Sequence, residues 1–566
     1  MRLAITAQEL RLLRMLLARA GEAVSMAELK CALWDDAGIP PDGVTQCLAS
    51  LRVLLQPVEC IENIYNRGYR ISVPVNAENM PDTPVLQRLV ILPFTSGYGV
   101  PEYFTSAILE HAMEQLSDAC AADVSMAPQD SVLALMRRGL SALEIGKKLE
   151  ADLVLSGMLH ATPTHIRLRA ELRRGETGAP LWTEDVLVES GQTVELMSIF
   201  VNRLILRLQG NSAKIKAAVK PEVESESAPR QREAYELYLR ARYEWKTYER
   251  HRMQDGMGHL LRAMELDPNL IGARIDLTHL CVTQAVYGSL SPRLAAAMIR
   301  RTTHPMPDFA SHAVAMAPAL GWVSFYVDRN LPEALRQFSL TTRLPHDLWL
   351  TPMRAMFALS RHRFDEAIDL LQKAIHIDPY TAWLYIKLAW ALHLAGEAEA
   401  SVEQARKTIE QFPERDGLKL YSAIILSYNG EAASVLEITQ TIAARMPQYD
   451  LAAATYAYVL ACAKQTEEAR AVLERLQWFS RERFVLNTFS VAAYVALGDT
   501  AAALAELRTA NENRCPWFFQ MLADPRLKPL HGNPEFEAMR ALLPLMEAEA
   551  EKEPPREECY LALEAS

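Results

Sequence analysis

The stretch YTAWLYIKLAWALHLAGEAEASVEQARKTIEQFP (residues 380–413) is one unit of a pattern that recurs every 34 residues. At this spacing stand Pro345, Pro379, Pro413 and Pro447. Because the ring of proline cannot continue a helix, a proline at this interval ends one pair of helices and precedes the next. The period therefore predicts a stack of helix pairs in the C-terminal half of the chain.

Small or apolar residues keep the same phase. One series is expected in the first helix of each pair: Ala355, Ala389, Ala423, Ala457 and Val491. The other is expected in the second helix, where the two must approach closely: Ala367, Ser401, Val435, Ala469 and Ala503. Period and phase resemble tetratricopeptide repeats, which form an α-solenoid with a concave groove for partners. We expect this array over residues 232–546, with its aromatic residues more often in the core than on a ligand: Trp383, Tyr385, Trp390, Tyr421 and Tyr428.

The ends of the array are less regular. Pro268 closes a first repeat and Pro318 another. Only 27 residues separate Pro318 from Pro345, so that repeat is expected to be shortened. Residues 517–543 have the composition of a segment that caps the array.

Composition narrows the class of protein. With 566 residues, half of them hydrophobic and 23% charged, the chain is expected to hold about three soluble domains. It has no run of 18 apolar residues, and its eight cysteines form no C-x-x-C pair, so no membrane span is expected and a reducing cytoplasm fits best. The net charge of −11 argues against a protein that coats nucleic acid indiscriminately. Part of that charge lies in an acidic tail, residues 547–566.

Residues 1–78 carry the signals of three helices and a hairpin. Capping boxes at Thr6/Glu9 and Ser25/Glu28 open the first two helices. The third, DGVTQCLASLRVLL (residues 42–55), has an apolar stripe of Val44, Leu48, Leu51 and Leu55. Alternating residues then flank the turn Asn66-Arg67-Gly68. This order predicts a winged helix-turn-helix.

The same residues resemble a known family. Leu48-Ala49-Ser50-Leu51-Arg52, Leu55, Ile61 and Gly68-Tyr69-Arg70 follow the pattern of the response-regulator and ToxR-type winged-helix transcription factors. Members usually begin with a small antiparallel sheet, whereas this chain has only about one strand's worth, Arg2–Ile5. We therefore expect that the start is trimmed or misassigned, or that the domain has lost that sheet.

If the third helix reads DNA, its stripe leaves one set of residues facing outward: Thr45, Gln46, Ala49, Ser50, Arg52 and Val53. Thr45 and Gln46 would read base edges and Arg52 would pair with phosphate or guanine. On the wing we expect Arg67 and Arg70 to contact DNA, with Tyr69 packed beneath. The alternative is a polar surface that pairs with protein, since residues 1–78 hold eight Lys or Arg against nine Asp or Glu.

Residues 86–210 alternate strand and helix signals and predict a small α/β domain. The stretch is similar to the TolB-like domain at Ile91-Leu92-Pro93-Phe94, at residues 151–157 and at Gly178-x-x-Leu181-Trp182. The resemblance implies a linking or sensing role. Residues 211–231, rich in Glu and Ser, are expected to be an exposed hinge before the array.

No constellation of residues favours an enzyme, a cofactor site or a metal site. The sequence at 97–99 (Gly-Tyr-Gly) lacks the rest of a dinucleotide motif, and Gly146-Lys147-Lys148 lacks the rest of a phosphate loop. His160 and His165 have no ligand partner at a suitable spacing.

A mainly α chain with a winged helix, an α/β domain and an α-solenoid, in this order, resembles the HilA-type invasion regulators of Gram-negative bacteria. The resemblance implies a cytoplasmic transcription factor that binds double-stranded DNA and activates type III secretion or virulence genes. RNA polymerase, another protein or a second copy would be the partner of the other domains. The competing hypothesis is an adaptor whose winged helix has decayed and whose repeats bind protein.

Overall fold

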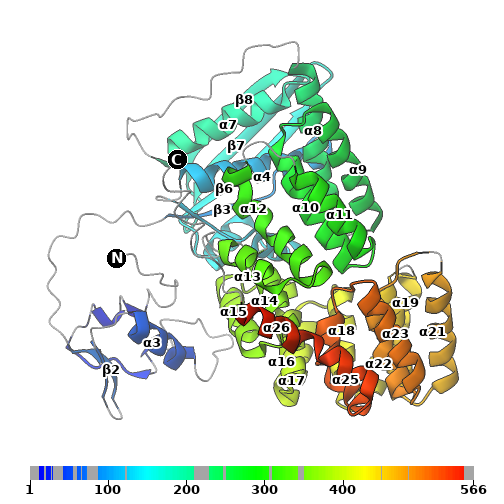
Figure 1. The fold of residues 1–566 in the computed structure, drawn as a ribbon. Helices are drawn as coiled ribbons and strands as arrows, with labels where there is room; N and C mark the ends of the chain where they lie inside the picture. Colours follow the sequence, from blue (N-terminus) through cyan, green and yellow to red (C-terminus); the bar gives the residue numbers. More distant parts are fainter. Residues whose placement is uncertain are drawn as a thin grey trace. The chain divides into compact units, whose positions relative to one another are not determined.

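The computed structural model describes residues 12–29 (without 14, 18, 20 and 27), 43–54, 60–64, 67–72, 87–120, 124–209, 228–245, 250–304, 309–341, 350–447, 449–481 and 483–552. The chain divides into two compact units, residues 1–85 and 86–566 (Figure 1). The expected strand Arg2–Ile5, the capping box Thr6/Glu9, Pro345 and most of the acidic tail lie outside the described residues.

The first unit has the elements of a winged helix. Helix α3 (Gly43–Leu54) is followed by the antiparallel strands β1 (Ile61–Ile64) and β2 (Gly68–Ile71). Residues 12–17 and 26–29 also contain helix. These elements bury one apolar cluster, which includes Leu12, Leu16, Leu29, Leu48 and Leu51.

The second unit begins with the expected α/β domain. Its sheet has the order β5-β3-β6-β7-β8, with β4 beside β6, and is parallel from β5 to β6 and antiparallel from β6 to β8. The strands are β3 (Gln87–Ile91), β4 (Thr95–Ser96), β5 (Val124–Met126), β6 (Leu153–Ala161), β7 (His165–Arg174) and β8 (Pro180–Glu189). The helices are α4 (Glu102–Ala119), α5 (Gln129–Arg137), α6 (Ala142–Lys148) and α7 (Thr193–Leu208). Apolar residues of α4 and α7 share a cluster with one face of the sheet, and those of α5 and α6 share another with the opposite side of β3 and β6.

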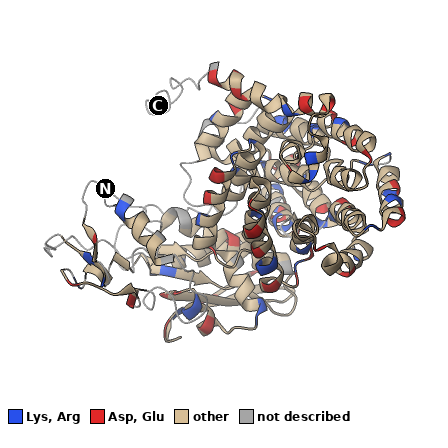
Figure 2. Ribbon diagram, turned by 90° about the horizontal axis from the view of Figure 1, so that it is seen from below, with Lys and Arg blue, Asp and Glu red and all other residues tan. Residues whose placement is uncertain are grey.

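The rest of the second unit is an array of helix pairs, as the 34-residue period predicts. Basic and acidic residues are interspersed along its helices (Figure 2). The irregular part contains α8 (Ala228–Trp245), α9 (Arg250–Leu266), α10 (Ile271–Val286), α11 (Pro292–Thr303), α12 (Phe309–Trp322), the π-helical η1 (Val323–Val327) and α13 (Leu331–Leu340). The regular part contains α14 (Leu350–Ser360), α15 (Phe364–Ile377), α16 (Ala382–Ala395), α17 (Ala398–Gln411), α18 (Asp416–Tyr428), α19 (Ala432–Arg445), α20 (Asp450–Cys462), α21 (Thr466–Ser480), α22 (Thr488–Ala496) and α23 (Thr500–Glu512).

The in-phase small residues lie where the sequence predicts. Ala355, Ala389 and Ala423 belong to first helices, Ala367 and Ser401 to second helices, and all are at most 1% exposed. The remaining members of both series are also buried. Small side chains at these positions allow the two helix backbones of a pair to approach closely.

A second feature has the same period. The residue between the two helices of each regular pair has a positive φ, and these residues are His362, Gly396, Gly430, Lys464 and Gly498. A left-handed residue at this point ends the first helix and turns the chain back. Glycine adopts this conformation without strain, whereas His362 and Lys464 bear the cost of their Cβ atoms.

Pro318 does not close a repeat, contrary to the expectation. It lies inside α12, which continues without a break into η1. A proline inside a helix removes one backbone hydrogen bond and crowds the preceding turn. The wider turn of the π-helix follows directly, so the helix continues past the proline instead of ending there.

The expectation of a hinge between the α/β domain and the array is wrong for its last residues. Helix α8 begins at Ala228, inside the predicted linker, and packs on α4 of the α/β domain. Arg242 of α8 forms ion pairs with Glu110 of α4 (2.9 Å) and Asp276 of α10 (3.3 Å). All three side chains are less than 20% exposed. The apolar core is therefore continuous from β3 to the end of the array.

The α/β domain also contacts the middle of the array. The hydroxyl of Ser131 on α5 donates a hydrogen bond to Asp378, in the turn after α15. Arg138 lies over the ring of Tyr380 at 5.7 Å and donates to the carbonyl of Gln411 at 3.5 Å. The α/β domain is thus held against the array in two places, at α8 and at the turn after α15.

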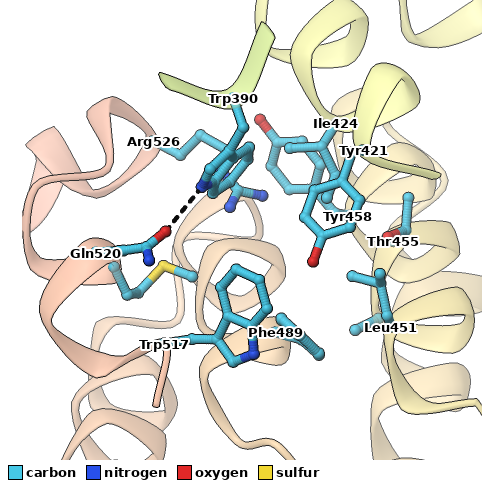
Figure 3. Close-up of a pocket in the computed structure, with 12 residues that line it drawn as sticks. Trp390, Tyr421, Ile424, Leu451, Thr455, Tyr458, Phe489, Trp517, Gln520 and Arg526 are labelled. Atoms are coloured by element: carbon cyan, nitrogen blue, oxygen red, sulfur yellow. Dashed lines mark hydrogen bonds between the residues drawn. The ribbon is translucent and has the colours of Figure 1, made fainter. Parts of the chain in front are cut away.

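After α23 the described chain packs on the inner face of the array. After α23 come α24 (Phe518–Leu522), η3 (Pro525–Leu530), α25 (Pro534–Arg540) and α26 (Leu542–Lys552). Figure 3 shows Trp517, Gln520 and Arg526 of this segment facing aromatic residues of the first helices, among them Trp390 and Tyr421. The indole of Trp390 donates a hydrogen bond to Gln520 (3.1 Å, Figure 3). The predicted capping segment therefore covers the inner face of the array.

A buried charge cluster fixes this segment. Asp524 forms an ion pair with Arg526 (2.7 Å) and accepts from His393 of α16 (3.4 Å). Burial alone would raise the pKa of Asp524, but the Arg526 guanidinium and the His393 ring hold it below its usual value. The guanidinium also lies over the ring of Tyr458 at 4.9 Å.

The left-handed turns provide a test of the repeat. We expect Lys464→Gly to raise the free energy of unfolding by about 1 kcal/mol, because glycine removes the strain of a positive φ of 65°. Gly396→Ala is the matched reverse change: no atom lies within 4 Å of the added methyl group, so strain alone should lower stability by about 1 kcal/mol. Urea denaturation measures both. Equal midpoints for the two variants would contradict this account of the turns.

The ion pairs of Arg242 provide a test of how α4, α8 and α10 are held together. Arg242→Met should destabilise the second unit by about 3–5 kcal/mol, because it leaves two buried carboxylates without their counter-charge. Arg240→Met on the same helix removes a guanidinium that is 53% exposed, and its partner Glu244 keeps a contact with His259 (2.7 Å), so this change should cost less than about 1 kcal/mol. Urea denaturation, with amide hydrogen exchange in α4 and α8, checks the difference. An Arg242→Met chain as stable as Arg240→Met would show that the two domains do not depend on this cluster.

Candidate nucleic-acid interface

Helix α3 has one buried and one exposed face. Val44, Leu48 and Leu51 are at most 1% exposed, which confirms three members of the predicted stripe, and the fourth, Leu55, lies outside the described residues. Thr45 and Ala49 lie on the exposed side, available to a groove of DNA. Gln46 and Ser50 lie within α3, but their side chains are outside the described residues, as is that of Val53.

The wing is the hairpin of β1 and β2. Arg67 is exposed in the turn between the strands, as a phosphate-contacting residue would be. Tyr69 is only 8% exposed and packs in the core, which confirms its predicted place. Arg70 stands opposite Glu62 and forms an ion pair with it (3.0 Å), so its charge is already balanced within the hairpin.

Arg52 connects α3 to the wing. Its Nε and Nη2 donate to the carbonyl oxygen of Ile61 at 3.3 and 3.1 Å. Its guanidinium also lies 5.7 Å from the centre of the Tyr69 ring. The side chain remains partly exposed, so a DNA contact is still open to it. These contacts join α3 to the first strand and the Tyr69 ring of the wing.

A backbone contact that the sequence pattern missed holds the wing from the other side. Val24 and Tyr69 exchange two hydrogen bonds of 2.9 Å and form an antiparallel bridge. Gly68, with a φ of 118°, lies directly against this contact: a Cβ there would be 1.9 Å from the Val24 carbonyl oxygen. One isolated residue has no strand periodicity, so only the glycine of the GYR motif marked the close approach.

The short helix after Val24 begins at the predicted capping box. The Ser25 amide donates to the Glu28 carboxylate (2.9 Å), and the Ser25 hydroxyl accepts from the Glu28 amide (3.3 Å). Arg19 forms an ion pair with the same carboxylate (2.8 Å). Arg19 and Ser25 together lower the pKa of Glu28 to about 2. The helix start is thus fixed next to Val24, whose backbone bridge holds the wing.

Comparison with known proteins agrees with this geometry. Residues 1–71 match the family model "Transcriptional regulatory protein, C terminal". The transcriptional regulator HilA of Salmonella typhimurium is 22% identical over 420 residues, which cover 73% of this chain and 67% of that protein. The chain is similar to transcriptional regulators of the HilA type. The resemblance expected from the sequence is therefore confirmed.

Two other matches cover parts of the chain. A putative adenylate cyclase 3 of Rhizobium meliloti is 25% identical over 288 residues, 47% of each chain. The crystal structure of the Cut9–Hcn1 complex matches 64% of this chain and 67% of that one, at 15% identity and a TM-score of 0.38.

In the α/β domain, the glycine motifs and the two histidines named in the sequence analysis do not form one site. Gly97 packs against the His160 ring on β6, where a Cβ would be 2.3 Å from Nδ1. His165 begins β7, and Gly146 lies inside α6. Among the described residues, no three His, Cys, Asp or Glu side chains are placed to hold a metal ion. No helix in the described part of the chain is both long and apolar enough to cross a membrane.

Gly68 should be essential for the wing. We expect Gly68→Ala to destabilise the hairpin by more than about 2 kcal/mol, because its methyl group would overlap the Val24 carbonyl. Gly21→Ala is the control: φ is also positive (87°), but no atom lies within 4 Å, so the cost should be about 1 kcal/mol. Amide hydrogen exchange of residues 60–72 in the full chain measures the loss. Equal exchange in the two variants would contradict the overlap.

Proposed function

We propose that this protein is a transcription factor that binds double-stranded DNA through α3 and the wing and activates its target genes. The observation that carries the proposal is the exposed face of α3 beside Arg67, within a domain that matches a transcriptional regulator family over residues 1–71. Thr45, Gln46, Ala49 and Ser50 would lie in the major groove. Arg67 would contact phosphate or the minor groove.

The similarity to HilA supports a more specific form of the proposal. The target genes would be virulence or type III secretion genes, and the protein would act in the cytoplasm. The second unit, which joins the α/β domain and the array around one core, would contact RNA polymerase, another protein or a second copy of the chain. Because residues 517–530 cover the inner face of the array, such a partner would meet other surfaces of the helices.

The competing function is an adaptor whose winged helix no longer reads DNA. The near balance of charge in residues 1–78 favours it. The folded wing and the tie between Arg52 and Ile61 oppose it, since both keep the geometry of a DNA reader. We also propose that the chain catalyses no covalent reaction.

DNA binding by the full chain tests the proposal. Binding to the DNA upstream of its neighbouring genes should be saturable and sequence-dependent. Arg67→Ala should weaken it on every sequence and reduce the slope of log affinity against log salt by about 1, because one phosphate contact is lost. Gln46→Ala should cost about 1–3 kcal/mol on the preferred site and relax its sequence preference. Fluorescence anisotropy measures both.

The control for this experiment is Arg406→Ala. Arg406 lies on α17 and pairs with Glu431, so its loss should leave DNA binding unchanged. Arg52→Ala is a less useful variant, because it removes the hydrogen bonds between α3 and the wing. A loss of binding could then come from a displaced wing or from a lost DNA contact. If the parent chain does not bind this DNA, or if both the Arg67→Ala and Gln46→Ala chains bind as tightly as the parent, the proposal is rejected in favour of the adaptor.

A further inference from the structure

Three arginines from distant parts of the array meet at the end of α23. Arg293, at the start of α11, donates through Nη2 to the carbonyl oxygen of Glu512 (2.8 Å). Arg329, after η1, donates through Nη2 to the side-chain oxygen of Asn511 (3.0 Å). Arg514 follows these two residues in the chain. The cluster therefore joins early and late helices of the array.

The charge of this arginine cluster (Arg293, Arg329 and Arg514) is not balanced. None of the three forms an ion pair with a carboxylate of the described residues, although opposite charges are mixed elsewhere over the array (Figure 2). The nearby carboxylate of Asp328 is held by Arg300 (2.6 Å). Burial, with repulsion from Arg514, lowers the pKa of Arg329 to about 9. Burial and Arg293 also lower the pKa of Arg514, against a smaller opposite effect of Asp328.

Two hydrogen-bond donors in the cluster are also unused. The Nε atoms of Arg329 and Arg514 are buried and have no hydrogen-bond acceptor among the described residues. The plane of the Arg329 guanidinium is fixed, because it lies 4.1 Å from the centre of the Phe519 ring. Buried donors and unpaired charges both cost free energy, and both costs are relieved when an anion supplies acceptor oxygens.

We propose that the arginine cluster binds the phosphate group of a small molecule. Arg293 and Arg329 each use one Nη2 within the chain, and the N–H groups that remain on the three guanidinium groups are donors for an anion. A phosphate offers several acceptor oxygens and up to two negative charges to meet them. A ligand can enter from the exposed side, where Arg293 lies. Bound there, it would tie α11 and the turn after η1 to the end of α23. The ligand would thus act on the second unit, independently of whether α3 binds DNA.

Thermal unfolding of the full chain tests this site. Inorganic phosphate is the probe, compared with sodium chloride at equal ionic strength and pH. We expect phosphate to raise Tm saturably at millimolar concentration, by roughly 2–4 °C, because it binds the folded chain and not the unfolded one. A nucleoside monophosphate should give the same shift at lower concentration. No shift beyond that of chloride, or a shift with duplex DNA alone, would overturn the proposal.

Substitutions identify the residues. Arg514→Gln should abolish the phosphate shift and, in chloride, should unfold at the same or a higher temperature than the parent, because one unpaired charge is removed. Arg293→Gln should also reduce the shift, and its exposed position makes it the second variant if Arg514→Gln folds poorly. Arg508→Gln on α23, whose parent residue pairs with Glu535 (2.7 Å), should keep the full shift. An unchanged shift in both cluster variants would place the phosphate elsewhere and reject the site.

Discussion

The second unit depends on the need of stacked helix pairs to bury the faces that no neighbouring pair covers. In a repeat array each helix pair contacts only the pairs next to it in the sequence. The apolar faces of the first pair and of the inner surface therefore stay exposed to solvent unless another segment packs on them. This chain covers the first pair with α4 of the α/β domain and the inner face with residues 517–530. The mostly buried Arg242 and the fully buried Asp524 stabilise these two contacts, because a charge removed from water is stable only with its partners in place.

This arrangement changes the role of the α/β domain. It is joined to the array at α8 and again at Asp378 and Tyr380, around one continuous core. A domain held in this way covers and orients the array, whereas a domain on a hinge would move independently of it. A ligand that binds the second unit is therefore expected to affect the α/β domain and the array together. The arginine cluster, which joins α11 to the end of α23, lies where a bound anion would affect that body most directly.

In the winged helix, the sequence predicts which side chains are buried or exposed but misses some of the contacts that they make. The stripe of α3, the burial of Tyr69 and the exposure of Arg67 follow from periodicity and turn chemistry, and the structure agrees with each. Arg52 lies on the predicted exposed side, yet its guanidinium is held by Ile61 and Tyr69. Its acceptor is a backbone carbonyl, which every residue has, so no side-chain pattern could reveal it. The bridge from Val24 to the wing was missed for the same reason.

The sequence by itself determined what repeats or what is local. The 34-residue period placed the buried small residues, because the same pattern recurs in each helix pair. The Ser25/Glu28 box placed a helix start, because its signal lies within one turn of helix. Only the tertiary structure decided where α8 packs, that Pro318 lies inside a helix instead of ending it, and that residues 517–530 pack on the inner face of the array. These depend on pairs such as Trp390 and Gln520, which are 130 residues apart. A contact across such a distance is set by the shape that all the intervening helices build together, and it leaves no periodic mark on the sequence.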